Sequence, residues 1–181
     1  MRAVALVLLC FLGLVSPAAA GEASGVEIVE FGLYTADVAG ELREPNGIVS
    51  NVIENICHIA TTTTVPMRPG VLFGMRYRVD GASAGDPVDL TLAVQFPTAL
   101  QPSGAARPVT RHERNAILAV GTTSYTGYSF DQDWEFVPGT WTLEVLQRGR
   151  KLAEQSFTVV DAPASSGAPS GPSSCFKVSS L

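Results

Sequence analysis

The sequence predicts an all-β fold, and three observations support this prediction. Apolar and polar residues alternate with a period of two over 71–80 and again over 88–96, which is the pattern of a half-buried strand. The segment 138–160 has the composition and turn residues of a β-hairpin. Glycine- and proline-containing turns separate the alternating runs, and no long segment has the 3.6-residue period of a helix.

The hairpin segment 138–160 has the clearest pattern in the chain. A Pro-Gly pair at 138–139 supplies the first turn, and a polar stretch with a glycine at 147–150 supplies the second. The apolar residues that alternate along its two arms are Trp141, Leu143, Val145, Phe157 and Val159. Because an isolated hairpin is marginally stable in water, this one must pack on further strands. We expect Trp141 to be the buried anchor and Trp134, which lies between two acidic residues, to lie nearer the surface.

The other strand-like segments extend the pattern over residues 25–161. They are 26–34, in which Gly32 would form a bulge, 51–65, 71–80, 88–96 and 109–120, where a strand is favoured over a short helix. Residues 39–47 and 97–108 are expected to be loops. About seven to nine strands in one domain fit an immunoglobulin-like antiparallel β-sandwich.

The first twenty residues have the features of a secretory signal peptide. Arg2 precedes an apolar run, and an Ala-Ala-Ala site ends at residue 20. The run is too short to favour a membrane span. We therefore expect an exported protein, periplasmic or extracellular, with no membrane insertion after cleavage.

The C-terminal segment 162–181 is expected to be a flexible tail, because most of it consists of alanine, serine, proline and glycine. Cys57 and Cys175 remain after signal cleavage. Cys57 alternates with Ile53 and Ile59, which places its thiol toward an apolar layer, and Cys175 follows the flexible segment. We expect that these two cysteines form no required disulfide, although an exported protein could form one.

The charge balance bears on the class of partner. The whole chain has a formal net charge of −5, and removal of residues 1–20 takes away one arginine and no acid. An acidic protein is not expected to bind nucleic acid or an anionic membrane. An unidentified protein or glycan partner in the cell envelope remains open.

No combination of residues predicts catalysis, a cofactor or a metal site. Ser129 lies in a Gly-Tyr-Ser sequence that lacks the last glycine of a nucleophile elbow, and only His58 and His112 could act as its base. The two histidines and the cysteines lack the spacing of a zinc site. We therefore expect a protein that is not an enzyme.

The segment 125–136 gives the one alternative to this expectation. A strand would align Asp131, Asp133 and Glu135 on one face, where they could bind Ca²⁺, act as a glycosidase pair or form a solvated acidic edge. Tyr125, Tyr128 and Trp134 could form a binding surface for a sugar or a protein, or could fill a core. Exposure of these aromatic residues beside the carboxylates would favour a carbohydrate-active or calcium-dependent accessory protein.

Four segments together resemble the bacterial domain-of-unknown-function family DUF3859. They are SGVEIVEFGLYTADV, PGVLFGMRYRV, DPVDLTLAVQFP and the stretch from GYSFDQDWEF to SFTVV. The resemblance covers nearly all of the domain but not the tail, and it implies an exported bacterial protein without implying an activity. The sequence thus favours a non-catalytic binding or interaction module.

Overall fold

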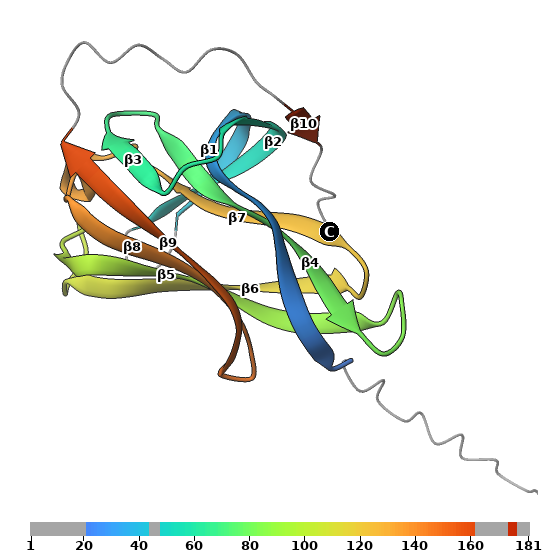
Figure 1. Cartoon of the computed structure of the whole chain (residues 1–181). Helices are drawn as coiled ribbons and strands as arrows, with labels where there is room; N and C mark the ends of the chain where they lie inside the picture. Colours follow the sequence, from blue (N-terminus) through green and yellow to red (C-terminus); the bar gives the residue numbers. More distant parts are fainter. Residues whose placement is uncertain (1–20, 44–47, 162–173, 177–181) are drawn as a thin grey trace, which may run out of the picture.

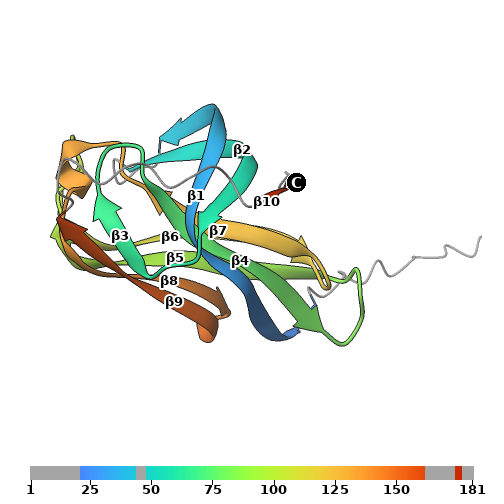
Figure 2. The same ribbon diagram turned by 45° about the horizontal axis from the view of Figure 1, so that its top comes forward.

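The computed structural model describes residues 21–43, 48–161 and 174–176. The chain forms two five-stranded sheets that pack face to face, with strand orders β10-β2-β1-β4-β7 and β3-β9-β8-β5-β6 (Figures 1 and 2). The strands are β1 (Ala23–Arg43), β2 (Val49–Ala60), β3 (Thr64–Met67), β4 (Leu72–Gly81), β5 (Pro87–Leu100), β6 (Val109–Ala119), β7 (Thr123–Ser129), β8 (Gly139–Gln147), β9 (Arg150–Asp161) and β10 (Ser174–Phe176), with one 3₁₀ turn, η1 (Asp133–Glu135). The predicted β-sandwich is confirmed, and the described residues form ten strands where about seven to nine were expected.

The core lies between the sheets and is centred on Trp141, which has no exposed surface. Its indole contacts aromatic rings from both sheets at centroid separations of 5.0 Å to Phe96, 5.0 Å to Tyr128 and 6.1 Å to Phe73. The indole N–H donates to the carbonyl oxygen of Val137 at 3.1 Å, so the polar atom of this buried ring is satisfied. Trp141 therefore joins the two sheets, and the prediction that it is the buried anchor is confirmed.

The two segments with the strongest alternation form the strands that were expected. The buried apolar side chains of β4 are Phe73, Met75, Tyr77 and Val79, and those of β8 are Trp141, Leu143 and Val145. Strands β8 and β9 are joined by a two-residue turn in which Arg148 and Gly149 have φ values of 50° and 79°. This left-handed pair matches the twist of a hairpin, and glycine adopts it without strain.

Two expected loops are partly strand. Strand β1 continues to Arg43, through the first part of the segment 39–47, and β5 continues to Leu100, past Pro97. In both cases pairing with a neighbouring strand outweighs the local composition, because β1 pairs with β2 as far as Arg43 and Leu100 pairs with Val109. The remaining residues of the first segment, 44–47, lie outside the described part of the chain.

Strand β1 is long because it pairs with two other strands. Its first half pairs with β4 and its second half with β2, and register shifts interrupt both ladders. Bulges of this kind bend a strand and increase its twist. The second half of β1 and all of β2 thereby form a hairpin at one side of the sandwich (Figures 1 and 2).

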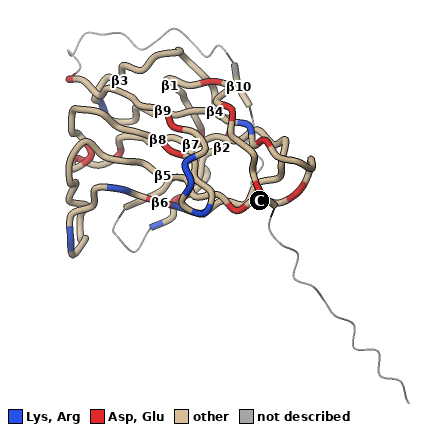
Figure 3. The backbone as a smooth tube through the Cα atoms, turned by 60° about the horizontal axis from the view of Figure 1, so that its bottom comes forward, with Lys and Arg blue, Asp and Glu red and all other residues tan. Residues whose placement is uncertain are grey.

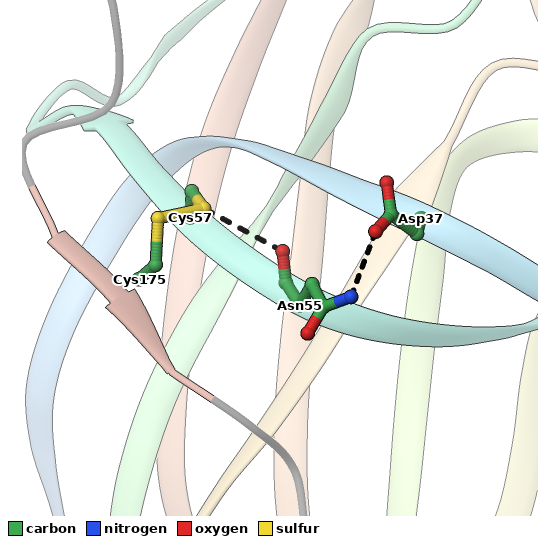
Figure 4. Close-up of a disulfide and its surroundings, with 4 residues drawn as sticks. All are labelled: Asp37, Asn55, Cys57 and Cys175. Atoms are coloured by element: carbon green, nitrogen blue, oxygen red, sulfur yellow. Dashed lines mark hydrogen bonds between the residues drawn. A yellow bond between two sulfur atoms is a disulfide. The ribbon is translucent and has the colours of Figure 1, made fainter.

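The expectation that Cys57 and Cys175 stay unpaired is wrong. The two residues are direct partners in the ladder between β2 and β10, and a disulfide joins them (Figure 4). Asn55 has φ 51° and donates its side-chain amide to Asp37 at 2.8 Å, and the β1–β2 register shifts here. This shift by one residue places Ile56, instead of Cys57, on the apolar face.

The C-terminal tail also differs from expectation at three residues. Ser174–Phe176 form the edge strand β10, where the sequence predicted a flexible segment over 162–181. Residues 162–173 and 177–181 lie outside the described part of the chain, as does the predicted signal peptide over 1–20. Among the described residues no helix is long and apolar enough to cross a membrane.

Because Trp141 and Trp134 differ in burial, replacing each by alanine should lower the free energy of unfolding by a different amount. Trp141→Ala should lower the free energy of unfolding by about 3–5 kcal/mol, because it removes a large buried ring. Trp134→Ala is the matched control and should cost less, since Trp134 is only partly buried against the core. Urea unfolding followed by circular dichroism measures both values. Equal losses, or a larger loss for Trp134→Ala, would contradict this account of the core.

The disulfide predicts that neither Cys57 nor Cys175 reacts with a thiol reagent in the denatured, unreduced monomer. Replacing both by serine should lower the free energy of unfolding by about 2–4 kcal/mol, because the bond joins residues separated by 118 positions. Peptide mapping of the unreduced protein identifies the linked pair. Free Cys57 and Cys175 thiols in protein purified without reductant would show that the bond is absent.

Candidate functional site

The three aromatic residues that the sequence proposed as a binding surface are not exposed together. Tyr125 and Tyr128 are buried, and their side chains lie on opposite faces of the sheet that contains β7, because Tyr128 contacts the core ring of Trp141 and Tyr125 belongs to a separate apolar cluster. Trp134 is partly buried against the core. The exposed aromatic platform required by the carbohydrate-binding alternative is therefore not formed by these three residues.

The three carboxylates predicted to share a strand face are also separated in the structure. Strand β7 ends at Ser129, and Asp133 and Glu135 lie in the 3₁₀ turn η1. Asp131 and Asp133 are exposed, whereas Glu135 is buried. The described residues contain no group of three or more His, Cys, Asp or Glu side chains that could hold a metal ion.

Glu135 has a structural position that the sequence did not indicate. Its carboxylate accepts hydrogen bonds from the Tyr128 hydroxyl at 2.8 Å, the Asp131 amide at 2.6 Å and the Gln132 amide at 2.8 Å. Burial raises the pKa of Glu135 above its usual value, and these hydrogen bonds oppose that effect. Burial also raises the pKa of Tyr128, so its hydroxyl stays protonated and donates. Glu135 thus fixes the chain after β7.

Hydrogen bonds link the turn that follows β7 to the β1–β2 hairpin. The Ser129 hydroxyl donates to the Asp131 carboxylate, so the candidate nucleophile is engaged in the turn. The same carboxylate accepts from the side-chain amide of Asn51 in β2 at 2.8 Å. Ile48, just before β2, is 1% exposed and belongs to the main core. The end of the hairpin is therefore held both by a polar contact and by a buried side chain.

A cleft of about 1140 Å³ lies where this hairpin faces the two sheets. Its walls are an unbroken run of β6 from His112 to Leu118, most of β7 from Ser124 to Ser129, and the hairpin end from Ile48 to Ile53. Leu92 and Val94 of β5 also line it. The cleft is larger than the 300–1,000 Å³ that is typical of sites for small ligands.

Two edge strands, β6 and β7, form the two lips of the cleft, meaning the borders where it opens to the surface. Strand β6 is the last strand of one sheet and β7 the last strand of the other, so each is paired on one side only among the described strands. An edge strand presents N–H and C=O groups that another strand can pair with. Exposed apolar side chains also line the cleft, namely Ile117 of β6, Leu42 of β1 and Val52 of β2.

The histidines lie in different surroundings. His58 is in β2, where its Nδ1 lies 3.7 Å from the Glu30 carboxylate and its Nε2 lies 3.2 Å from the carbonyl oxygen of Phe31. His112 is in β6 on the wall of the cleft and is 7% exposed. The two imidazoles thus belong to opposite sheets, and each is largely buried in its own sheet.

Comparison with known proteins identifies the class. The family described as "Domain of unknown function (DUF3859)" matches residues 23–159, and the chain belongs to this family. A crystal structure of an immunoglobulin-like protein from Pseudomonas aeruginosa is 31% identical, with a TM-score of 0.52 over 78% of this chain and 99% of that one. The fold is therefore immunoglobulin-like, and the family resemblance seen in the sequence is confirmed.

More distant similarities add no functional information. A β-glucosidase from Listeria innocua is 12% identical, with a TM-score of 0.33 over 70% of this chain and 16% of that one. A β-glucosidase from Kluyveromyces marxianus is 9% identical, with a TM-score of 0.28 over 71% and 14%. No curated protein matches the chain.

The buried carboxylate predicts a specific pH dependence. Because the pKa of Glu135 is raised in the folded state, its contribution to stability is complete at pH values below 4.5 and is lost as the pH rises through the folded pKa. Glutamine cannot ionise, so Glu135→Gln should remove this loss of stability at higher pH. The free energy of unfolding of the wild type should therefore fall relative to that of the variant as the pH rises from about 4 to 7. The fall should be at most about 1.4 kcal/mol for each unit by which the pKa is raised. Urea unfolding at several pH values measures the difference.

Asp133→Asn is the matched control, because Asp133 lies in the same turn and is exposed. Its effect on the free energy of unfolding should be small and should not follow the Glu135→Gln profile. A wild type that gains stability over Glu135→Gln with rising pH would reverse the assigned direction and contradict the prediction.

Proposed function

We propose that this protein is a non-catalytic, exported binding module that takes an extended polypeptide segment of a partner into the cleft between β6 and β7. The observation that carries the proposal is the pair of strand edges that form the lips of the cleft. A peptide strand that enters such a cleft adds to a sheet edge through main-chain hydrogen bonds, and alternate side chains then enter the groove.

The cleft floor supports a polypeptide as the ligand. Leu92, Val94 and Leu118 supply buried apolar surface there, while Arg114 and Asn115 of β6 are exposed at the rim. An apolar centre with a polar rim is the usual arrangement of a protein interface. Glycan binding commonly uses exposed aromatic rings, and Tyr125 and Tyr128, which line the cleft, are 6% and 8% exposed.

Charge and redox chemistry support the compartment and the partner class. Basic and acidic residues are interspersed along the described chain in Figure 3, in place of the one-sided basic surface that nucleic-acid binding requires. A disulfide between Cys57 and Cys175 suits an oxidising compartment such as the periplasm or the cell exterior. The predicted signal peptide agrees with export.

A peptide library displayed on phage, selected against the immobilised protein, tests the proposal. Sequences with alternating apolar residues should be enriched, and Ile117→Lys should weaken their binding about tenfold or more, because it removes an exposed apolar contact and adds a charge at the lip. Val160→Lys is the matched control, since Val160 is an exposed apolar residue of β9, which does not line the cleft.

Two results would overturn the proposal. One is enrichment of peptides that bind the wild type and Ile117→Lys equally well. The other is failure to enrich any peptide while the protein binds immobilised oligosaccharides, which would favour the carbohydrate-binding alternative.

A further inference from the structure

A second apolar cluster lies on the outer face of the sheet that contains β1, β4 and β7, and two of its residues, Ile56 and Tyr125, also line the cleft between β6 and β7. Tyr34, Ile56 and Tyr125 are its buried members, and Phe176 of β10 packs against them. The ring of Phe176 lies 6.4 Å from that of Tyr34 and 6.3 Å from that of Tyr125, between centroids. The guanidinium carbon of Arg76 lies 4.3 Å from the centroid of Phe176.

The outer sheet face is hollowed to accept these rings. Gly32, Gly74 and Gly127 are direct neighbours across β1, β4 and β7, so three strands in a row lack a side chain at one level. A Cβ atom on Gly74 or Gly127 would collide with the hydroxyl of Tyr125. The glycines therefore let the Tyr125 ring lie close against the sheet, and Tyr34 packs edge-on against that ring at 4.9 Å.

Charged groups lie beside the same apolar cluster. Glu30 lies 3.5 Å from Arg76 and 3.7 Å from His58, and it accepts a hydrogen bond from the Tyr34 hydroxyl at 3.4 Å. Arg76 is thus held beside the aromatic cluster, with its guanidinium over the Phe176 ring. A guanidinium over an aromatic ring is an attractive arrangement, so Arg76 favours an aromatic side chain at the position of Phe176.

Strand β10, which carries Phe176, is a short strand at the edge of its sheet. Strand β10 consists of three residues and pairs only with β2 among the described strands. Cys175 is exposed and Cys57 is partly exposed, so a reductant can approach the disulfide from solvent (Figure 4). Twelve residues, 162–173, separate β10 from the end of β9 in the sequence. The disulfide therefore ties this short edge strand covalently to β2.

We propose that β10 is a removable cover on a second binding site, which takes an extended polypeptide segment with an aromatic side chain from a partner protein, and that reduction of the Cys57–Cys175 disulfide by a protein dithiol opens this site. Phe176 shows which side chain fits, and the free edge of β2 supplies main-chain pairing for the incoming segment. This site adjoins the cleft between β6 and β7 and shares Ile56 and Tyr125 with its lining, but it is defined by β10 and the disulfide and does not depend on the proposed function of that cleft.

The opening step is a thiol–disulfide exchange. A thiolate of the dithiol attacks one sulfur of the pair and forms a mixed disulfide, and the other cysteine leaves as a thiolate. The second thiol of the dithiol then attacks the mixed disulfide. The dithiol ends as a disulfide, and Cys57 and Cys175 end as thiols, so two electrons and two protons pass to this protein.

The first experiment tests whether the cover can be released from the folded protein. The full chain with Cys10→Ser is treated with dithiothreitol without denaturant, and alkylation of Cys57 and Cys175 is followed by mass spectrometry. Both thiols should be alkylated while the tryptophan fluorescence, to which the buried Trp141 contributes, stays native. Reduction that occurs only together with unfolding would overturn the proposal.

The second experiment tests recognition with the full chain carrying Cys10→Ser and Cys175→Ser, in which Cys57 is the single thiol. The probe is a synthetic peptide of the sequence 171–181, whose cysteine is activated as a mixed disulfide with thionitrobenzoate. Cys57 attacks the peptide sulfur, the peptide becomes disulfide-linked to Cys57, and coloured thionitrobenzoate leaves. The peptide with phenylalanine should react about tenfold or more faster than the same peptide with alanine in its place, because only the former fills the pocket.

Arg76→Gln should reduce this preference, whereas Arg78→Gln should not, because Arg78 lies on the same strand but pairs with Glu27 and Asp80. Equal rates for the two peptides, or equal effects of the two arginine substitutions, would overturn the proposal. A Cys57 thiol that reacts with neither peptide in the folded protein would overturn it as well.

Discussion

The packing of Trp141 between the two sheets is the interaction on which the rest of the structure depends. Its ring contacts Tyr128 of the opposite sheet at 5.0 Å, which fixes both the separation of the sheets and the position of β7. The Tyr128 hydroxyl then reaches Glu135, and Glu135 holds the amides of Asp131 and Gln132. Asp131 in turn binds Asn51 of the β1–β2 hairpin. A chain of direct contacts thus runs from the centre of the core to the hairpin that borders the cleft.

This arrangement explains why the cleft stays open along two strand edges. Strands β6 and β7 follow one another in the sequence but belong to different sheets, so neither can pair with the other. The β1–β2 hairpin is fixed beside them by Ile48 and Asn51. The hairpin therefore borders the cleft that the two edges line.

Much of the fold could be predicted because the apolar residues that alternate along β4 and β8 are the ones that are buried in the structure. Trp141, Phe73 and Tyr77 are fully buried, as a two-residue period requires. The prediction failed where the phase of the pattern changes. The left-handed Asn55 shifts β2 by one residue, and this turns Cys57 away from the apolar face. A shift of this kind depends on pairing with β1, which the sequence of β2 alone does not contain.

The site was harder to predict than the fold for a related reason. The sequence proposed Tyr125, Tyr128 and Glu135 as members of an exposed site, but all three are buried, and their burial depends on contacts that the local sequence does not contain. Tyr125 lies over glycines of two strands, and Phe176 completes its cluster from the C-terminal segment. The cleft is likewise formed by strand edges, and an edge is defined by the order of strands in a sheet instead of by composition.

The proposed function requires that a partner segment pairs with the backbone of a strand at the edge of the cleft. Amide hydrogen exchange, followed residue by residue with and without a selected peptide, tests it most directly. Pairing should slow exchange at alternate amides of β6 or of β7, because only every second N–H of an edge strand points outward. Slowed exchange confined to other strands, or binding that leaves the amides of both β6 and β7 unchanged, would contradict the account.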